Sequence, residues 1–146
     1  MGFGVSGSTA VIFLGVLIAS GTLYTAAAGS AEQITDARDG KGEDLLDRRN
    51  TDLEITKTVY NQSTDVLELN VTNTGTTTLS VNGTSLLVDN EYVTPDTTSV
   101  DGDGSTDVWG AGDVLVVTAT NNSTPERVTV VAENGVAASN STIEVS

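Results

Sequence analysis

The feature that most constrains this chain is a long N-terminal stretch without charge. No Asp, Glu, Lys or Arg occurs between Gly2 and Ala31, and the densest apolar run is AVIFLGVLIAS at residues 10–20. About 20 apolar residues in a helix cover the hydrocarbon core of a bilayer. Residues 1–29 are therefore predicted to form one transmembrane helix that contacts lipid through the side chains of Val11, Ile12, Phe13, Leu14, Val16, Leu17 and Ile18.

A cleaved secretory signal is the main alternative for this stretch. Such signals begin with basic residues, and no Lys or Arg precedes the apolar run here. The small residues Ala26, Ala27 and Ala28 resemble a cleavage site, so this alternative stays open.

Residues 30–50 are predicted to be a charged stalk or linker, which is either a stalk helix that pairs with a partner or a solvated linker. The helix is expected to continue to about Ala37 and to break near Gly40 and Gly42. Four basic side chains lie in this linker, at Arg38, Lys41, Arg48 and Arg49, and none precedes the helix. The positive-inside rule alone would place the C-terminal side in the cytoplasm.

From Thr51 onward the hydrophobic period changes to two. In residues 67–71 (LELNV), for example, aliphatic and polar side chains alternate, which is the pattern of a half-buried strand. Turn signals such as Asn82-Gly83 and Asn134-Gly135 separate the runs. Seven to nine short strands of this kind predict that residues 51–146 form an all-β, antiparallel, immunoglobulin-like sandwich.

Two parts of the predicted sandwich stand out. Residues 113–120 (DVLVVTAT) are apolar on both faces and are the best candidate for a central strand. Alternatively, this segment is an edge strand that pairs with a second copy of the chain, to form a homodimer, or with a partner strand. Trp109 lies beside Gly110 and Gly112 and is expected at the rim or in a loop.

The charge and composition exclude several classes of function. The chain has 20 acidic and six basic side chains, a net charge of −14, and neither His nor Cys. Phosphate backbones would be repelled, so no nucleic-acid partner is expected. Without imidazole or thiol groups the usual catalytic triads are excluded, and the chain is predicted to have no catalytic residues and no enzymatic activity. Such acidity is typical of proteins from salt-loving organisms.

Six Asn-x-Ser/Thr sequons occur, at Asn61, Asn70, Asn82, Asn121, Asn122 and Asn140. All lie in the predicted sandwich, which favours an extracytoplasmic location for that domain despite the positive-inside rule. The predicted arrangement is a single-pass protein of the cell membrane with its C-terminal domain outside. Asn61, Asn82 and Asn121 fall in predicted turns and are the preferred candidates for glycosylation.

One loop resembles a site for a hard cation. In residues 101–107 (DGDGSTD), Asp101, Asp103 and Asp107 offer carboxylates that a divalent cation such as Ca²⁺ prefers. The alternative is an acidic hairpin loop without a ligand. No other cofactor is expected.

The opening GFGVSGSTAVIFLGVLIASGTLYTA, the charged linker and the Asn- and Thr-rich sandwich resemble the archaellum-associated FlaF family in its haloarchaeal form. Its members are stator proteins of the archaeal swimming motor, with one N-terminal pilin-like helix and an outer β-sandwich. The resemblance implies that the sandwich binds the surface-layer protein, together with the companion stator protein FlaG, and gives the rotating filament a fixed frame.

Two alternatives remain beside a stator. The second hypothesis is a filament subunit, a minor archaellin or pilin, which would be processed after Gly2 and would pack its helix into a fibre core. However, no basic residue precedes Gly2, and Gly7 occupies the fifth position after that point, where prepilins have Glu. The third hypothesis is a generic surface-binding protein.

Overall fold

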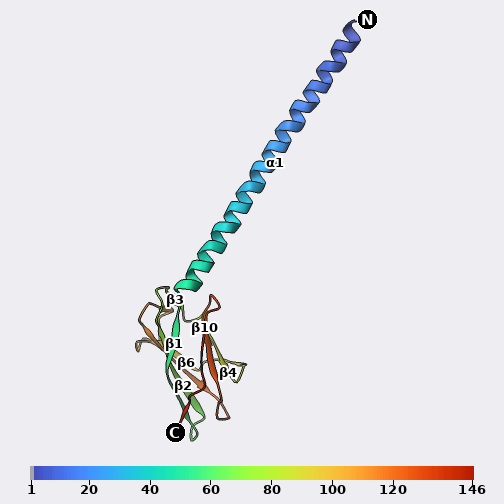
Figure 1. Ribbon diagram of the computed structural model, residues 1–146. Helices are drawn as coiled ribbons and strands as arrows, with labels where there is room; N and C mark the ends of the chain where they lie inside the picture. The colour runs from blue at the N-terminus through green and yellow to red at the C-terminus, as the bar shows by residue number, and fades with distance from the viewer. Residues whose placement is uncertain (1) are drawn as a thin grey trace. The chain divides into compact units, whose positions relative to one another are not determined.

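The computed structural model describes residues 2–146, with the side chains of residues 8–22, 25, 28–29 and 40–146. Helix α1 spans Gly2–Asn50, and eleven β-strands follow it (Figure 1). The chain divides into two compact units, Met1–Glu43 and Asp44–Ser146. The last turns of α1 therefore belong to the same unit as the strands.

Helix α1 is longer than the sequence predicted. It passes through Gly40 and Gly42 without a break and ends only at Asn50, so the predicted break is wrong. Glycine costs a helix about 1 kcal/mol relative to alanine. Good helix formers follow the glycines, including Leu45 and Leu46, and the end of the helix is hydrogen-bonded to the sandwich. These contributions outweigh the cost of the two glycines.

The apolar run that was predicted to cross a membrane lies within α1. Its large side chains from Val11 to Ile18 are exposed in the isolated chain. Met1 and the side chains of residues 2–7, 23–24 and 26–27 lie outside the described residues. In the described part of the chain, no helix has the length and hydropathy of a membrane span.

The strands of the second unit are short, and all lie after residue 52. Their bounds are β1 Leu53–Asn61, β2 Val66–Asn73, β3 Leu79–Ser80, β4 Ser85–Val88, β5 Glu91–Val93, β6 Thr97–Val100, β7 Val108–Trp109, β8 Val114–Thr120, β9 Val128–Val131, β10 Ala137–Asn140 and β11 Glu144–Val145.

The strands form a sandwich of two main sheets. One has five strands in the order β11-β1-β2-β8-β6, and the other has four in the order β10-β9-β4-β5. Figure 1 labels β1, β2 and β6 in one layer and β4 and β10 in the other. A small third sheet pairs β3 with β7. The predicted all-β sandwich is confirmed.

The pairing refines two of the predictions. β8 lies between β2 and β6, so the segment 113–120 forms an interior strand and not an edge. All the pairings are antiparallel except one, because β11 runs parallel to β1. Three of the eleven strands, β3, β7 and β11, have only two residues, and this explains why the sequence pattern predicted fewer strands.

The core lies between the two main sheets and is mostly aliphatic. Its two large aromatic side chains are Tyr60 and Trp109, both at most 2% exposed. The expectation that Trp109 lies at the rim is wrong. Its indole N–H donates to the Asp113 carbonyl at 3.0 Å, so the one polar atom of the ring is satisfied and the ring can be buried without an unpaired donor.

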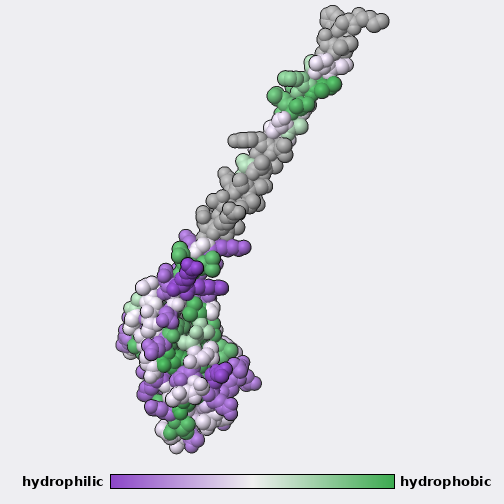
Figure 2. Space-filling model, viewed as in Figure 1, coloured by the Kyte–Doolittle hydropathy of each residue, from purple (hydrophilic) through white to green (hydrophobic). Residues whose placement is uncertain are grey.

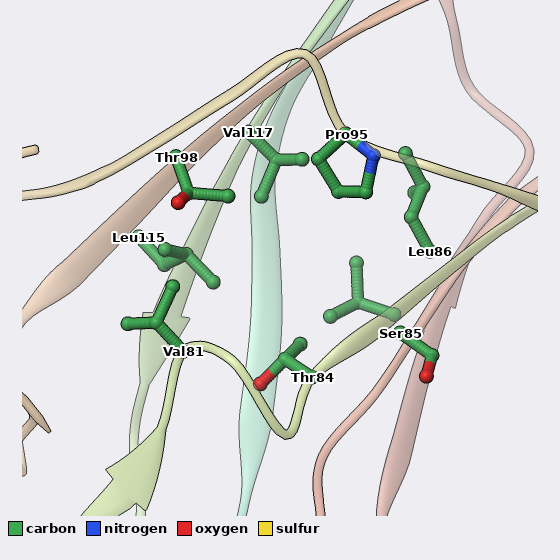
Figure 3. A pocket seen from close by; sticks show the side chains of 9 residues that line it. Val81, Thr84, Ser85, Leu86, Pro95, Thr98, Leu115 and Val117 are labelled. Carbon is green, nitrogen blue, oxygen red and sulfur yellow. The ribbon is translucent and has the colours of Figure 1, made fainter. Parts of the chain in front are cut away.

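A small cavity of about 30 Å³ remains in this core, where β4 faces β6 and β8. Figure 3 shows Leu115 and Val117 from β8 lining one side and Leu86 from β4 another, with Pro95 beside them. The lining is largely apolar. A cavity of this kind leaves the side chains around it without part of their packing contacts.

Filling this cavity should stabilise the sandwich. We expect Val117→Ile to raise the free energy of unfolding by up to about 0.8 kcal/mol, the value of one buried methylene group. The matched control is Val71→Ile, since Val71 is fully buried in β2 but does not line the cavity. Overpacking there should lower the stability by about 1–3 kcal/mol. Denaturation at constant molar salt, followed by fluorescence of the single tryptophan, measures both; equal effects would contradict the assignment.

Candidate functional site

The end of α1 is bonded to the sandwich through its last carbonyl groups. The Asn50 carbonyl accepts hydrogen bonds from the N–H groups of Thr76 and Thr77, at 2.7 and 3.3 Å. The Asp47 carbonyl accepts the hydroxyls of Thr51 and Thr77, at 2.6 and 3.2 Å. A helix leaves its final four carbonyls without intrahelical partners, and here the sandwich supplies partners for two of them. We call these five residues the helix-end junction.

The Asn73 side chain holds the loop that makes this junction. Asn73 is fully buried at the end of β2. Its Nδ2 donates to the carbonyls of Thr77 and Trp109 at 2.8 and 3.3 Å, and its Oδ1 accepts the Gly75 N–H at 3.2 Å. One amide thus fixes both the loop that receives the helix and the strand that carries the buried tryptophan.

The junction leaves no room for a side chain at position 75. A Cβ atom at Gly75 would collide with the Asn50 carbonyl and the Asp52 nitrogen. The junction also reaches the other sheet, because Asn134, in the turn between β9 and β10, donates from Nδ2 to the Thr51 hydroxyl at 2.7 Å. The end of the helix is therefore bonded to segments that belong to both main sheets.

The predicted cation loop caps the edge of β6. The backbones of Val100 and Asp103 exchange two hydrogen bonds of 2.9 Å, so the loop folds back beside the strand. The Asp101 carboxylate accepts the Val114 N–H at 3.1 Å, and the Asp103 carboxylate accepts the N–H and hydroxyl of Ser105 at 2.8 and 2.7 Å. The bonds from Ser105 lower the pKa of Asp103.

The third predicted ligand, Asp107, has different partners. Its carboxylate contacts the Ser80 hydroxyl at 3.0 Å and accepts the Asn82 N–H at 2.7 Å. The Glu133 carboxylate accepts the Ser80 N–H at 3.0 Å in the same turn. The structure therefore does not gather the three predicted ligands around one point. No group of three or more acidic, His or Cys side chains that could hold a metal ion occurs in the described part of the chain.

Sequence reasoning missed this use of carboxylates to close turns. Asp89 provides a second case, because its Oδ1 accepts the N–H groups of Glu126 and Arg127 at 2.8 and 2.9 Å. Asp89 itself has a positive φ of 50°, and Asp is one of the residue types that tolerate that conformation. The sequence shows an acidic residue at this turn, but it does not show which distant backbone N–H groups the carboxylate accepts.

The sequons differ in how free their amides are. Asn82 is exposed and Asn122 is exposed, and neither side chain makes a hydrogen bond within the described residues. The Asn121 Nδ2 donates to the Ser123 carbonyl, and the Asn61 Oδ1 accepts the Ser63 N–H at 2.9 Å. Of the three preferred candidates, the structure therefore leaves only Asn82 with an unengaged side chain.

The remaining two sequons are poorly placed for a glycan. Asn70 lies inside β2, between β1 and β8. Asn140 uses its Nδ2 to donate to the Thr58 hydroxyl at 3.1 Å and to the Thr142 carbonyl at 2.9 Å. A glycosylated nitrogen would have to give up these bonds.

The predicted anchor presents apolar side chains on every side of α1. Seven large apolar residues from Val11 to Ile18 are each 59–73% exposed, and Figure 2 shows them as a hydrophobic section of the helix. At 100° per residue, consecutive positions such as 11–14 point in all directions. A helix that is apolar all round needs lipid or other helices to cover it.

The model of a family described as archaeal-type flagellin matches residues 2–142. No curated protein matches the chain.

Solved structures offer weaker resemblances. The archaellum periplasmic stator protein FlaG from Sulfolobus acidocaldarius is similar with a TM-score of 0.43 and 19% identity, over 62% of this chain and 97% of that one. The stator complex of FlaF and FlaG from the same organism gives 0.40 and 18%, over 60% and 85%. The ligand-binding region of serine-glutamate repeat protein A from Enterococcus faecium gives 0.38 and 15%, over 66% and 97%. At these TM-scores and identities, no function follows from the similarity to the solved structures.

Replacing Asn73 should loosen both loops that it holds. We expect Asn73→Ala to lower the free energy of unfolding by about 2–4 kcal/mol, because several buried groups lose a hydrogen-bond partner. The matched control is Asn122→Ala, which removes an exposed amide without a partner and should change stability by less than about 0.5 kcal/mol. Denaturation at constant salt measures both variants. Similar stabilities would show that Asn73 does not hold the junction.

The free amides predict an order of glycosylation. In protein isolated from its native host, we expect glycans on Asn82 and Asn122 before any other sequon, and none on Asn70 or Asn140. Peptide mapping by mass spectrometry gives the occupancy of each site. A glycan found chiefly on Asn70 would contradict this order, since that side chain lies within a strand paired on both sides.

Proposed function

The chain belongs to the family of archaeal-type flagellins, and from this premise we propose that it is a stationary, non-catalytic tether of the archaellum. In this role α1 is anchored in the cell membrane and the sandwich lies outside, where it binds the surface layer. The observation that carries the proposal is that one family model covers helix and sandwich together, over residues 2–142, while the end of the helix is bonded into both sheets. A tether needs this continuity, because it is loaded at both ends.

The exposed apolar section of α1 supports the membrane anchor. Seven large side chains that are at least 59% exposed would be costly to leave in water. Lipid covers an apolar helix on all sides at once, which suits a section without a polar face. We therefore assign Val11–Ile18, near the N-terminal end of the chain, as the section of the tether that contacts lipid.

The sandwich is the end that binds other proteins of the envelope. We take the surface-layer protein and a FlaG-type companion as its partners, which the sequence resemblance to the FlaF family implies. Residues 51–146 carry 14 acidic and two basic side chains. Such a surface suits molar salt, in which like charges are screened within about 3 Å. The same resemblance implies that the sandwich lies outside the cell membrane, where the surface-layer protein is.

A filament subunit is the second candidate. The family description favours it directly, because it names flagellins, and other helices could cover the apolar section of α1 as well as lipid. Against it, the chain has Gly7 at the position where prepilins have Glu. A stationary tether does not need that glutamate, and we therefore prefer it.

Deleting the gene separates the two candidates. A strain without a tether should assemble archaella of normal number and length but should not swim, because the motor has no fixed frame. Electron microscopy counts the filaments and tracking measures the swimming. Restoration by the full chain is the control. A deletion strain without filaments would instead support the subunit, and normal swimming would overturn both.

A further inference from the structure

We propose that the free edge of β10 is a docking site for an extended, uncharged segment of a partner protein, which adds as a fifth strand to the sheet β10-β9-β4-β5. The proposal deepens the proposed function, on which it rests, by placing a partner contact of the tether. Strand addition of this kind takes its affinity from backbone hydrogen bonds and its specificity from alternate side chains.

The backbone of β10 has unpaired groups that point outward. The Ala132 N–H donates to the Val136 carbonyl at 2.8 Å, in register with the pairing of β9 and β10. Along an antiparallel ladder, every second pair of facing residues is hydrogen-bonded. Counting in steps of two from Val136, the next residues of β10 that bond to β9 are Ala138 and Asn140. Ala137 and Ser139 therefore point their N–H and C=O groups away from β9. These groups have no hydrogen-bond partner within the described residues.

The edges of the two main sheets at β6, β5 and β11 are protected. The loop that follows β6 folds back and bonds to Val100. β5 has only three residues and begins with the exposed Glu91, and β11 has only two and begins with the exposed Glu144. Short strands and charges of this kind prevent unwanted pairing. By contrast, β10 has four residues and neither charge nor proline.

β10 and the residues next to it carry no charge. Residues 136–142 (VAASNST) carry no charge, although residues 51–146 include 14 acidic side chains. The neighbouring rows on the outer face of the sheet are also uncharged. One row runs across the sheet from Ser139 through Thr129 and Leu87 to Tyr92. The other runs from Ala137 through Val131 to Ser85. A partner segment that joins this sheet therefore faces no carboxylate from these rows.

An apolar seam lies beside the edge. Asn134 bonds to Thr51 and Asn140 bonds to Thr58, so β10 runs alongside β1 in the same direction. Ala138 consequently lies about level with Ile55, and both side chains are only partly buried against the core. An added strand would cover this seam with every second side chain. The partner segment should therefore carry small or aliphatic residues at alternate positions on its inner face.

A second copy of the chain does not fit this edge. Two identical strands related by a two-fold axis in this position run antiparallel. The helix-end junction lies at the Asn134 end of β10, so the two helix ends would leave from opposite ends of the paired sheet. Under the proposed function both helices lead to one membrane, so we assign this edge to a different protein. A segment of a different protein, which can run in either direction, has no such restriction.

Hydrogen exchange tests the proposal on the full chain without identifying the partner. The probes are the backbone amides of Ala137 and Ser139, with those of Ala138 and Asn140 as internal controls that β9 protects. In the purified chain at native salt, we expect the two probes to exchange rapidly. In isolated cell envelopes that bear archaella, strand addition should slow them by about tenfold or more, whereas the controls should change little.

A variant pair carries the test to the cell. Ser139→Pro removes the outward N–H, and proline is tolerated where an edge N–H points away from the sheet. Ser139→Ala is the matched control, because it removes the same hydroxyl but keeps the N–H. We expect the proline strain to assemble filaments yet lose at least half of its swimming speed, and the alanine strain to swim normally. If the proline variant fails to fold, the exchange measurement decides alone.

The outcomes separate this proposal from the proposed function. Rapid exchange of both probes in envelopes overturns the docking site, even when the deletion strain behaves as a tether mutant. Normal swimming of a folded proline variant does the same. Slowing that appears already in the purified chain, and grows with its concentration, would assign the edge to a second copy. A deletion strain that swims normally would overturn the tether and leave any protection of β10 unaffected.

Discussion

The final carbonyl groups of α1 are the constraint on which one end of the sandwich depends. A helix end that stops against a protein surface must find partners for its carbonyls, because burial without them is costly. Here the loop after β2 supplies two N–H groups to the Asn50 carbonyl. That loop can approach so closely only because Gly75 has no side chain. Asn73 then holds the loop in place from inside the core.

The same end of the molecule shows how few groups connect the parts. The Asn73 amide connects the loop after β2 with the strand that carries Trp109, and the Thr51 hydroxyl connects the helix end with the turn between β9 and β10. These contacts are neutral hydrogen bonds and not ion pairs. Because salt screens charges but leaves short neutral hydrogen bonds intact, such a junction suits a protein with the acidity of this one.

Much of the fold could be predicted from local sequence, whereas most of the site could not. Alternating side chains such as those of residues 67–71 revealed the strands, because period two is a local property of one segment. The end of α1 was misjudged because Gly40 and Gly42 are local breakers, while the contacts that extend the helix come from Thr76 and Thr77. Trp109 was misplaced for a similar reason, since the carbonyl that satisfies its indole was not visible beforehand.

The acidic loops show the same limit of prediction from local sequence. Residues 101–107 look like a ligand set on paper because their carboxylates are close in sequence. In the fold, Asp101 bonds to the start of β8 and Asp107 to the turn after β3. The positions of the partners depend on strand order, which alternation alone does not determine. Sequence therefore identified which residues were chemically notable, but not which backbone groups they serve.

The carboxylates that close turns divide the acidic residues of this chain into two groups with different evolutionary freedom. Glu54 and Glu144 lie exposed on strands and are free to be replaced by neutral residues. Asp89, Asp107 and Glu133 are not, because each accepts backbone N–H groups that would otherwise be left unpaired. Among descendants of this chain, neutral residues should therefore replace the exposed strand acids first, and the acids that remained would be those at the turns.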